Sequence, residues 1–481
     1  MSENKILVTG GYVISMDDQY GDVPDGAVLL EGDRVAAVGK AKEFAGVDAQ
    51  VIDAKGGIIL PGMVDSHRHT WMALLRAISA DMSLPEFLAS TFYGIGSILQ
   101  PEDLGAATLV GALEALDSGV TSIMDCCDCV NSPEHAIAAV ESLKESGIRG
   151  VYAYGLQAFD YQPPGFTGHR HRLDTAESLY LRYFSGKNDL MRMGMLLSDF
   201  GTIPFADTAA EIRLAKDLGI LVASHTGAAS NSILLKGLRE LNDHGLLLPG
   251  HLHIHCTALT GPEWKLLAET GAKVTIAPET EMQMGMGRPP FRACLDHGIM
   301  PAFSTDIVCV GSGDLFSQMR LGLQFQRCMD NEHIHHTGVM PQTIDLSVRH
   351  ALTWATHGSA AAIGLGDQIG SLTPGKKADL IILSHPRAMV PSSYPAGSAV
   401  LQTTASDVDT VIVNGKLRKR HGQLLDVDLD AIRVRARQGL ERIQVAATAV
   451  ADRSPEEVAK WFGHAERMAS VNFASAYSKE L

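Results

Sequence analysis

The feature that most constrains the fold of this chain is a series of eight short apolar runs, each followed by a segment with helical periodicity. Nearly continuous apolar runs are typical of parallel strands that are buried on both faces and joined by crossover helices. Eight such units in succession predict an α/β fold, a TIM (β/α)8 barrel. The runs cover residues 58–66, 120–126, 150–155, 192–198, 220–224, 251–256, 272–277 and 300–305.

The segments on either side of the predicted barrel have a different pattern. Short β-rich runs alternate with turns near the N-terminus, and this pattern returns after the barrel. We therefore expect a flanking β-sandwich that is built from both chain ends. The expected division is 1–57 and 368–425 for the two parts of the sandwich, 58–367 for the barrel and 426–481 for a helical tail.

Composition limits the compartment and the partners. The 481 residues include 46% apolar and 20% charged side chains, which is the balance of a soluble globular protein. The sequence shows neither a membrane-spanning run nor a signal-peptide pattern, and its seven cysteines form no disulfide framework. We therefore expect a cytoplasmic protein. The formal net charge of −15 argues against nucleic acid or an anionic membrane as a partner.

Polar side chains stand where several of the predicted strands end, which is where the active sites of TIM barrels lie. His67 and His69 end the first run, and being two residues apart on a strand they point to the same face. His225, His255 and Asp306 end the fifth, sixth and eighth runs. Three imidazoles and one carboxylate suit Zn(II) or Fe(II), with a position left for water. One such histidine alone would more often be structural, but the conjunction predicts a metal site.

At these residues the chain resembles the amidohydrolase superfamily, on the branch of the mononuclear-metal deaminases and triazine hydrolases. The resemblance rests on PGMVDSHRH at 61–69, on the strand-end residues His225, His255 and Asp306, and on GSL with GKKADL at 370–380. It implies a metal-dependent hydrolase whose barrel is flanked by a β-sandwich. It also suggests a homodimer.

The resemblance implies a ligand set and a metal count. In mononuclear relatives the ion is held by the counterparts of four residues, and the counterpart of His255 lies near the attacking water. Binuclear relatives usually carry a carboxylated lysine at the end of strand four, whereas the run at 192–198 has no lysine. We therefore expect one divalent metal ion per chain, with Zn(II) favoured over Fe(II). The implied ligands are His67, His69, His225 and Asp306.

These residues suggest a mechanism. A divalent ion lowers the pKa of a water that it binds toward neutrality, which makes a nucleophile available at pH 7. Asp306 could take the proton of that water. His255 could hold the water in line and stabilise the oxyanion that forms at the attacked carbon.

One departure from the resemblance bears on the substrate. Many related deaminases have a proton-shuttling Glu three residues after the strand-five histidine, and this chain has Ala228 there. The seventh run is followed by Glu279 and Glu281, and we expect Glu281, or else Glu279, to serve as the replacement acid. The simpler interpretation pairs both acids with Arg288 or Arg292 nearby. A substrate with a good leaving group, or with an amide or urea carbonyl, would need no such acid.

The leading hypothesis is a hydrolase that uses a metal-activated water to cleave a C–N bond of a small nitrogen-containing ring compound. The reaction could be a deamination or an amide or urea hydrolysis. The alternatives are hydrolytic removal of chloride or another leaving group from a heterocycle, and a non-hydrolytic lyase or isomerase reaction at the same metal. The expected partner is therefore a small molecule, an N-heterocycle or an aromatic amide or urea.

Overall fold

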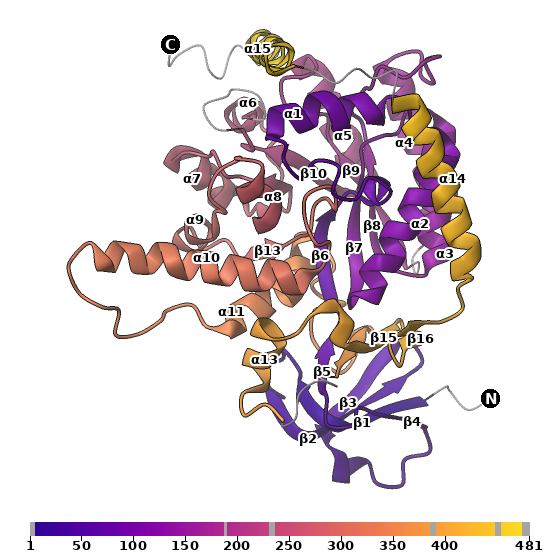
Figure 1. Ribbon diagram of the computed structural model, residues 1–481, viewed down its shortest axis with the longest axis vertical. Coiled ribbons are helices and arrows are strands. Elements are labelled where there is room, and N and C mark those ends of the chain that lie inside the picture. The colour runs from indigo at the N-terminus through magenta and orange to yellow at the C-terminus, as the bar shows by residue number, and fades with distance from the viewer. Residues whose placement is uncertain (1–4, 187–189, 230–235, 385–390, 448–453, 474–481) are drawn as a thin grey trace.

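A sheet of eight parallel strands forms the centre of the protein (Figure 1). The structure is a computed structural model, and it describes residues 5–186, 190–229, 236–384, 391–447 and 454–473. The strands are neighbours in sequence order, which confirms the predicted TIM barrel. They are β6 (Met63–Arg68), β7 (Val120–Cys127), β8 (Arg149–Gly155), β9 (Met191–Leu196), β10 (Leu221–Thr226), β11 (Leu252–His255), β12 (Lys273–Ile276) and β13 (Pro301–Phe303).

The barrel closes between β6 and the segment that follows β13. Arg68 and Asp306 form a parallel bridge. The backbone N–H of His69 donates to the carbonyl of Asp306 at 2.9 Å, and the N–H of Asp306 donates to the carbonyl of His67 at 3.0 Å. The seam of the barrel therefore lies at the strand ends that carry the predicted metal ligands.

The flanking sheet has nine strands, and both chain ends contribute to it as predicted. Its apolar side chains form a core of their own, in which Val8 and Val28 from the N-terminal part pack with Leu380 and Ile412 from the C-terminal part. The strands are β1 (Lys5–Ile14), β2 (Asp22–Glu31), β3 (Arg34–Lys40), β4 (Gln50–Asp53), β5 (Ile58–Pro61), β14 (Leu380–Leu383), β15 (Val408–Val413), β16 (Lys416–Arg420) and β17 (Gln423–Leu424).

The prediction of a single barrel strand at 58–66 is wrong. Its first half is β5, which pairs with β1 and β14 in the flanking sheet, and the barrel strand begins only at Met63. Gly62 separates the two halves, and a Cβ there would lie 2.0 Å from the Thr121 hydroxyl oxygen, so the close approach excludes any larger residue. The division of the chain between residues 57 and 58 stays a prediction.

Helices surround the barrel, and two of them, α14 and α15, follow the last strand of the flanking sheet in the sequence. α10 projects sideways from the barrel in Figure 1. The helices of the first half are η1 (Ala41–Phe44), η2 (Thr70–Met72), α1 (Leu84–Phe87), η3 (Leu88–Ile95), α2 (Pro101–Asp117), α3 (Pro133–Ser146), α4 (His169–Tyr183) and α5 (Phe205–Leu218). Those of the second half are α6 (Leu238–Asp243), α7 (Gly261–Thr270), α8 (Pro278–Gln283), α9 (Phe291–Asp296), α10 (Leu315–His335), α11 (Val348–Thr353), η4 (Trp354–Gly358), α12 (Ser359–Ala362), α13 (Pro395–Leu401), η5 (Ala405–Asp407), α14 (Leu429–Ala447) and α15 (Pro455–Asn472).

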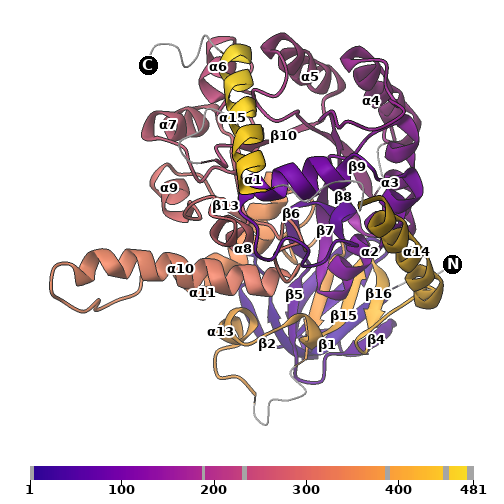
Figure 2. The same ribbon diagram turned by 45° about the horizontal axis from the view of Figure 1, so that its top comes forward.

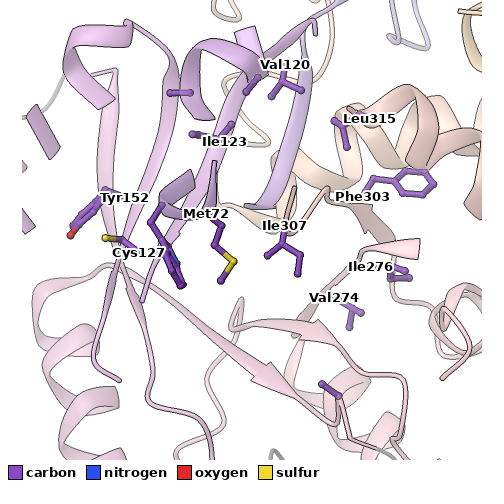
Figure 3. Close-up of a cluster of buried hydrophobic side chains, with 14 of the residues drawn as sticks. Met72, Val120, Ile123, Cys127, Tyr152, Val274, Ile276, Phe303, Ile307 and Leu315 are labelled. Carbon is purple, nitrogen blue, oxygen red and sulfur yellow. The ribbon is translucent and has the colours of Figure 1, made fainter. Parts of the chain in front are cut away.

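The main core joins the barrel strands to the helices around them. Figure 3 shows Val120 and Ile123 of β7 in the same cluster as Val274 and Ile276 of β12. Burying each such side chain contributes about 1.5–3 kcal/mol, so the core fixes the strand ends on which the polar side chains stand. Among the described residues, no helix has the length and apolar character that crossing a membrane requires.

The C-terminal tail forms two helices that return to the barrel. α14 packs along α2, where Arg442 forms an ion pair with the buried Asp103 at 2.6 Å. α15 is capped by Ser454, whose hydroxyl accepts from the N–H of Glu457 at 3.3 Å, while the Glu457 carboxylate accepts from the N–H of Ser454 at 2.7 Å. α15 contacts α1 and η3, so both helices lie against the barrel domain.

Candidate metal centre and active site

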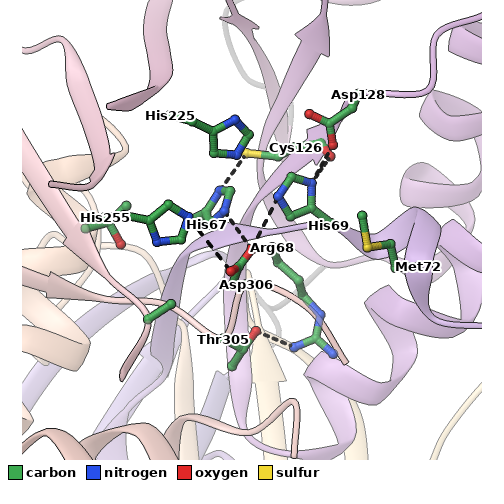
Figure 4. Close-up of polar contacts among 12 residues, drawn as sticks. His67, Arg68, His69, Met72, Cys126, Asp128, His225, His255, Thr305 and Asp306 are labelled. Atoms are coloured by element: carbon green, nitrogen blue, oxygen red, sulfur yellow. Dashed lines mark hydrogen bonds and ion pairs between the residues drawn. The ribbon is translucent and has the colours of Figure 1, made fainter. Parts of the chain in front are cut away.

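Four imidazole rings and one carboxylate meet at the carboxyl end of the barrel (Figure 4). The ligand atoms of His67, His69 and Asp306 lie within 4.8 Å of one another, and so do those of His67, His225 and His255. The structure thus brings together all five strand-end residues that the sequence singles out. The side chains of four of the five are almost fully buried, and that of His225 is 13% exposed.

Each imidazole is held from outside through its Nδ1 atom. The outer partners are of mixed chemistry, one thiol and three carboxylates. The contacts run from His67 to Cys126 Sγ (3.0 Å), from His69 to Asp128 Oδ2 (2.5 Å), from His225 to Asp199 Oδ1 (3.0 Å) and from His255 to Glu281 Oε1 (3.2 Å). Outer partners of this kind fix the ring orientation and the tautomer of metal-binding histidines.

The Nε2 atoms of these rings are left for the centre of the site. His67 Nε2 lies 2.9 Å and His69 Nε2 3.3 Å from Asp306 Oδ1, while His255 Nε2 lies 3.9 Å from Asp306 Oδ2. His67 and His225 have ring centroids 5.3 Å apart. Four nitrogen lone pairs and a carboxylate that converge in this way fit a divalent transition metal such as zinc.

The electrostatics of the site favour a cation. Burial lowers the pKa of His67 to about 3, so this ring is neutral. Burial also opposes charge on His69 and His225, yet the carboxylates of Asp128 and Asp199 raise the pKa of these two rings above the ordinary value. The negative potential that raises these pKa values also stabilises a metal ion at the centre.

A buried polar network lies directly behind the seam of the barrel. The Thr305 hydroxyl donates to Asp65 Oδ2 at 2.5 Å and accepts from Arg68 Nη1 at 3.1 Å. Arg68 also donates to the carbonyl of Gly313 at 2.9 Å, and the N–H of Thr305 donates to Asp65 Oδ1 at 3.0 Å. The network ties β6 to the segment after β13, and it thereby sets the position of Asp306 beside the histidines.

Two residues of the site have backbone conformations that residues other than glycine rarely adopt. The φ angle of His255 is 73° and that of Asp306 is 59°, both in the left-handed region. A non-glycine residue there costs about 1–3 kcal/mol and persists only when the surrounding structure holds it. Such strain is typical of functional sites, where it aims a side chain that an ordinary strand end would point elsewhere.

Among the described residues, the two acids after strand seven contact no arginine, so the simpler sequence interpretation is wrong. Glu281 is fully buried, and its Oε1 accepts from the N–H of Ala277 at 2.9 Å and contacts His255 Nδ1. Glu279 instead accepts from Ser312 N at 3.0 Å and from Gln318 Nε2 at 2.7 Å. The guanidinium of the nearby arginine, Arg292, is bound to Asp330 at 2.5 Å.

Three outer partners of the histidines were not predicted from the sequence. Cys126 ends the second apolar run, Asp128 follows that run, and Asp199 follows the fourth. Strand-end position was the signal that could have found them, since it had already selected the five central residues. The other histidines near the sixth strand, His251 and His253, are not among the residues that converge on the centre; they contact the hydroxyls of Ser224 (2.9 Å) and Thr226 (3.0 Å), respectively.

A cavity of about 40 Å³ lies over the centre. That volume is enough to hold water molecules beside the histidines. α1 and η3 cover it with apolar side chains, and Ala228 stands on its wall at the position where related deaminases carry the shuttle acid. Among the described residues, no Lys or Arg side chain lines this cavity. The lining comprises His69, Leu84, Phe87, Leu88, Phe92, Asp199, His225, Ala228, His255, Thr280, Met284, Met286, Asp306 and Ile307.

Three comparisons with known proteins agree with this geometry. The profile of the amidohydrolase family matches residues 58–418. A 5-methylthioadenosine/S-adenosylhomocysteine deaminase from Bacillus cereus (strain AH187) is 29% identical over 453 residues, which cover 91% of this chain and 100% of that protein.

Solved structures share the fold. An adenosine deaminase from Xanthomonas campestris with bound zinc has a TM-score of 0.81 and 23% identity, over 92% of this chain and 99% of that one. The atrazine chlorohydrolase of Arthrobacter aurescens TC1 in complex with zinc has a TM-score of 0.78 and 22% identity, over 90% of this chain and 100% of that one. Because the family profile covers most of the chain, the protein belongs to the amidohydrolase family, and it is a hydrolase that acts on C–N bonds with a site that suits a divalent metal.

Proposed function

We propose that the protein hydrolyses a C–N bond of a small, uncharged, nitrogen-containing ring compound, with one zinc ion per chain. The observation that carries the proposal is the convergence of four Nε2 atoms and the Asp306 carboxylate at the barrel mouth. The apolar cover, and a described lining that contains no Lys or Arg, support a neutral substrate. The deaminase and chlorohydrolase relatives are both named for nitrogen heterocycles, which supports the ring.

In this proposal, His67, His69, His225 and Asp306 hold the metal. When bound, a divalent ion supplies Lewis acidity and a water whose pKa lies near neutrality. The outer partners keep the Nε2 lone pairs aimed inward, so little reorganisation is needed on binding. The absence of a lysine from β9 supports a single ion. Zn(II) is preferred to Fe(II) because zinc, unlike Fe(II), is not oxidised in air.

Asp306 and His255 handle the protons and the developing charge. Asp306 Oδ1 is shared between His67 and His69, whereas Oδ2 faces His255 at 3.9 Å, so this second oxygen is placed to accept a proton from an attacking water. Once His255 carries a proton on Nε2, it can donate to the oxygen that is bound to the attacked carbon. Asp306 and His255 are therefore the two protein groups that the addition of water to the substrate requires.

Glu281 completes the acid and base machinery through His255. Its carboxylate holds His255 Nδ1 at 3.2 Å and is absent from the cavity lining, so it acts on the histidine and not on the substrate directly. The pair can take up and return one proton, in the way that a carboxylate assists a neighbouring imidazole. We propose that this pair supplies the leaving group with the proton that Ala228 cannot.

A second reaction fits the same site. Hydrolytic displacement of a good leaving group such as chloride needs no protonation of that group, and the alanine at position 228 favours this reaction. A metal-dependent lyase or isomerase step would use the same residues without consuming water. Homodimer formation and a cytoplasmic location remain expectations from the sequence.

Metal analysis joined to a solvent-oxygen assay tests the proposal. Purified protein should contain about one zinc per chain, and the His67→Ala variant should contain none, whereas His333→Ala, at an exposed histidine of α10, should keep the metal. Substrate panels of amino-triazines, chloro-triazines, aminopyrimidines and aryl ureas should be assayed in ¹⁸O-labelled water. Labelled product with release of ammonia or amine supports C–N hydrolysis, and labelled product with chloride release supports the second reaction.

Two results would contradict the proposal. Two metals per chain would require a bridging group that the four strand ends do not offer. Turnover without incorporation of labelled oxygen would indicate a lyase or isomerase, and the roles given to Asp306 and His255 would then have to be abandoned.

A further inference from the structure

The C-terminal helix α15 lies across the mouth of the barrel, beyond the segment 58–418 that matches the family profile. Figure 2 shows it running beside α1 and on toward α6. A helix of 18 residues spans about 27 Å. Its two ends make different contacts, and each contact leads to the cavity.

The first half of α15 touches the cover. The rings of Trp461 and Tyr93 have centroids 5.6 Å apart, and Tyr93 in turn packs edge-on against Phe92 at 5.0 Å. Phe92 belongs to η3 and lines the cavity. A displacement of the cover away from the barrel must therefore either break the contact with Trp461 or carry α15 along.

The second end of α15 touches the loop between β9 and α5. Asn472 Nδ2 donates to the carbonyl of Gly201 at 2.7 Å. Ala469 packs closely on Gly201: a Cβ added to Gly201 would lie 2.5 Å from the Cβ of Ala469. Gly201 is two residues after Asp199, which lines the cavity and contacts His225 Nδ1 at 3.0 Å.

We propose that α15 is a strap that couples the cover to the Asp199 loop and so sets how far the cavity opens, with Trp461 and Asn472 as positioning residues. A rigid helix that is fastened at both ends transmits a movement of one wall to the other. The strap therefore limits the size of the substrate, and this role rests on the proposed function. The coupling of the cover to the Asp199 loop does not depend on that function.

Hydrogen exchange on the full-length zinc protein tests the coupling. Trp461→Ala should speed amide exchange about tenfold at 88–95 and also at 199–205, the wall that Trp461 does not touch. Asn472→Ala should likewise speed amide exchange at 199–205, the wall that Asn472 contacts, and also at 88–95, the opposite wall. The control is Val471→Ala, because this side chain is 68% exposed on the same helix. Changes confined to the wall that each residue touches would overturn the proposal.

The rate of zinc removal tests the opening of the cavity. Dipicolinate should extract zinc about tenfold faster from Trp461→Ala and Asn472→Ala than from the parent protein. Val471→Ala should match the parent, and Trp461→Phe should restore most of the slow rate because it keeps an aromatic contact with Tyr93. Equal rates in all variants would overturn the strap. A protein that binds no zinc would refute the proposed function, while the exchange experiment would still decide the coupling.

Discussion

Glu281 lies, at the scale of single residues, behind the proposed site and not within it. It is fully buried, it contacts Nδ1 of His255, and its second oxygen, Oε2, has no hydrogen-bond partner among the described residues. A buried carboxylate in this state is costly, so its retention calls for a function. Orientation and charge stabilisation of His255 provide one.

Glu281→Gln should lower kcat on the order of 10²-fold while leaving the metal content unchanged. The amide keeps the shape of the side chain but loses the charge that stabilises a protonated His255. Steady-state kinetics on any substrate found in the panel measures the effect. Glu279→Gln is the matched control, since this acid lies two residues away and contacts Ser312 and Gln318 instead. A kcat equal to that of the parent would leave Glu281 with a structural role only.

Glu211 makes the stability of the protein depend on pH. Burial raises its pKa from 4.5 to about 8, although the carboxyl accepts two hydrogen bonds from Ser198. In the unfolded chain the group loses its proton above pH 4.5, whereas the folded protein keeps it up to about pH 8. Ionisation therefore favours unfolding, and this contribution to stability falls as the pH rises through that window.

Glu211→Gln should remove this pH dependence. The amide resembles the protonated acid, so the variant should gain stability relative to the parent by up to about 1.4 kcal/mol per pH unit across the window. Urea unfolding at pH 5 and pH 8 measures the difference. A gap between variant and parent that stays constant from pH 5 to pH 8 would show that Glu211 ionises normally in the folded protein.

At the scale of elements, the first and last strands of the barrel are joined by the same residues that build the site. The polar network of Asp65, Arg68 and Thr305 holds β6 against the segment after β13, and the three side chains are nearly inaccessible to solvent. Strand ends could be predicted from sequence because apolar runs stop abruptly there. The network could not, since nothing in the local pattern says that Thr305 faces Asp65 across 240 residues.

Thr305→Val should destabilise the protein by about 1–3 kcal/mol, because it leaves Asp65 and Arg68 each short of a buried partner. It should also weaken zinc binding by about 10–100-fold through the displaced Asp306. Chemical unfolding and zinc titration measure the two effects. Thr108→Val serves as the control, because Thr108 is equally buried and its hydroxyl has no hydrogen-bond partner. Equal losses in both variants would show that the network does not hold the seam.

At the scale of the whole molecule, the sequence predicted the architecture well and the closure poorly. The eight strand and helix units and the return of the C-terminal strands to the flanking sheet follow from periodicity, which is a local property. The split of 58–66 at Gly62 does not, because it depends on the close approach of Thr121 from another strand. The contacts of α15 with the cover also depend on tertiary packing.

Removal of the metal should lower the stability of the entire barrel. The proposed ligands come from β6, from β10 and from the segment after β13, so the ion links strands that are far apart in sequence. At free zinc a thousandfold above the dissociation constant, binding contributes about 4 kcal/mol to the free energy of unfolding. Thermal unfolding with and without a chelator should show a lower midpoint for the apo protein, restored by zinc. An unchanged midpoint would mean that the ion does not cross-link the folded state.

The distance in sequence between the two sides of the seam has a consequence for biosynthesis. His67 and Asp306 are 239 residues apart, and a ribosome makes the chain from the N-terminus at about 5–20 residues per second. For at least about ten seconds, therefore, the nascent chain exposes a pair of histidines that has no carboxylate partner and an open sheet edge at β6. Metal capture and closure of that edge become possible together, late in synthesis, so a ribosome that stops before residue 306 releases a fragment that is both inactive and prone to aggregate.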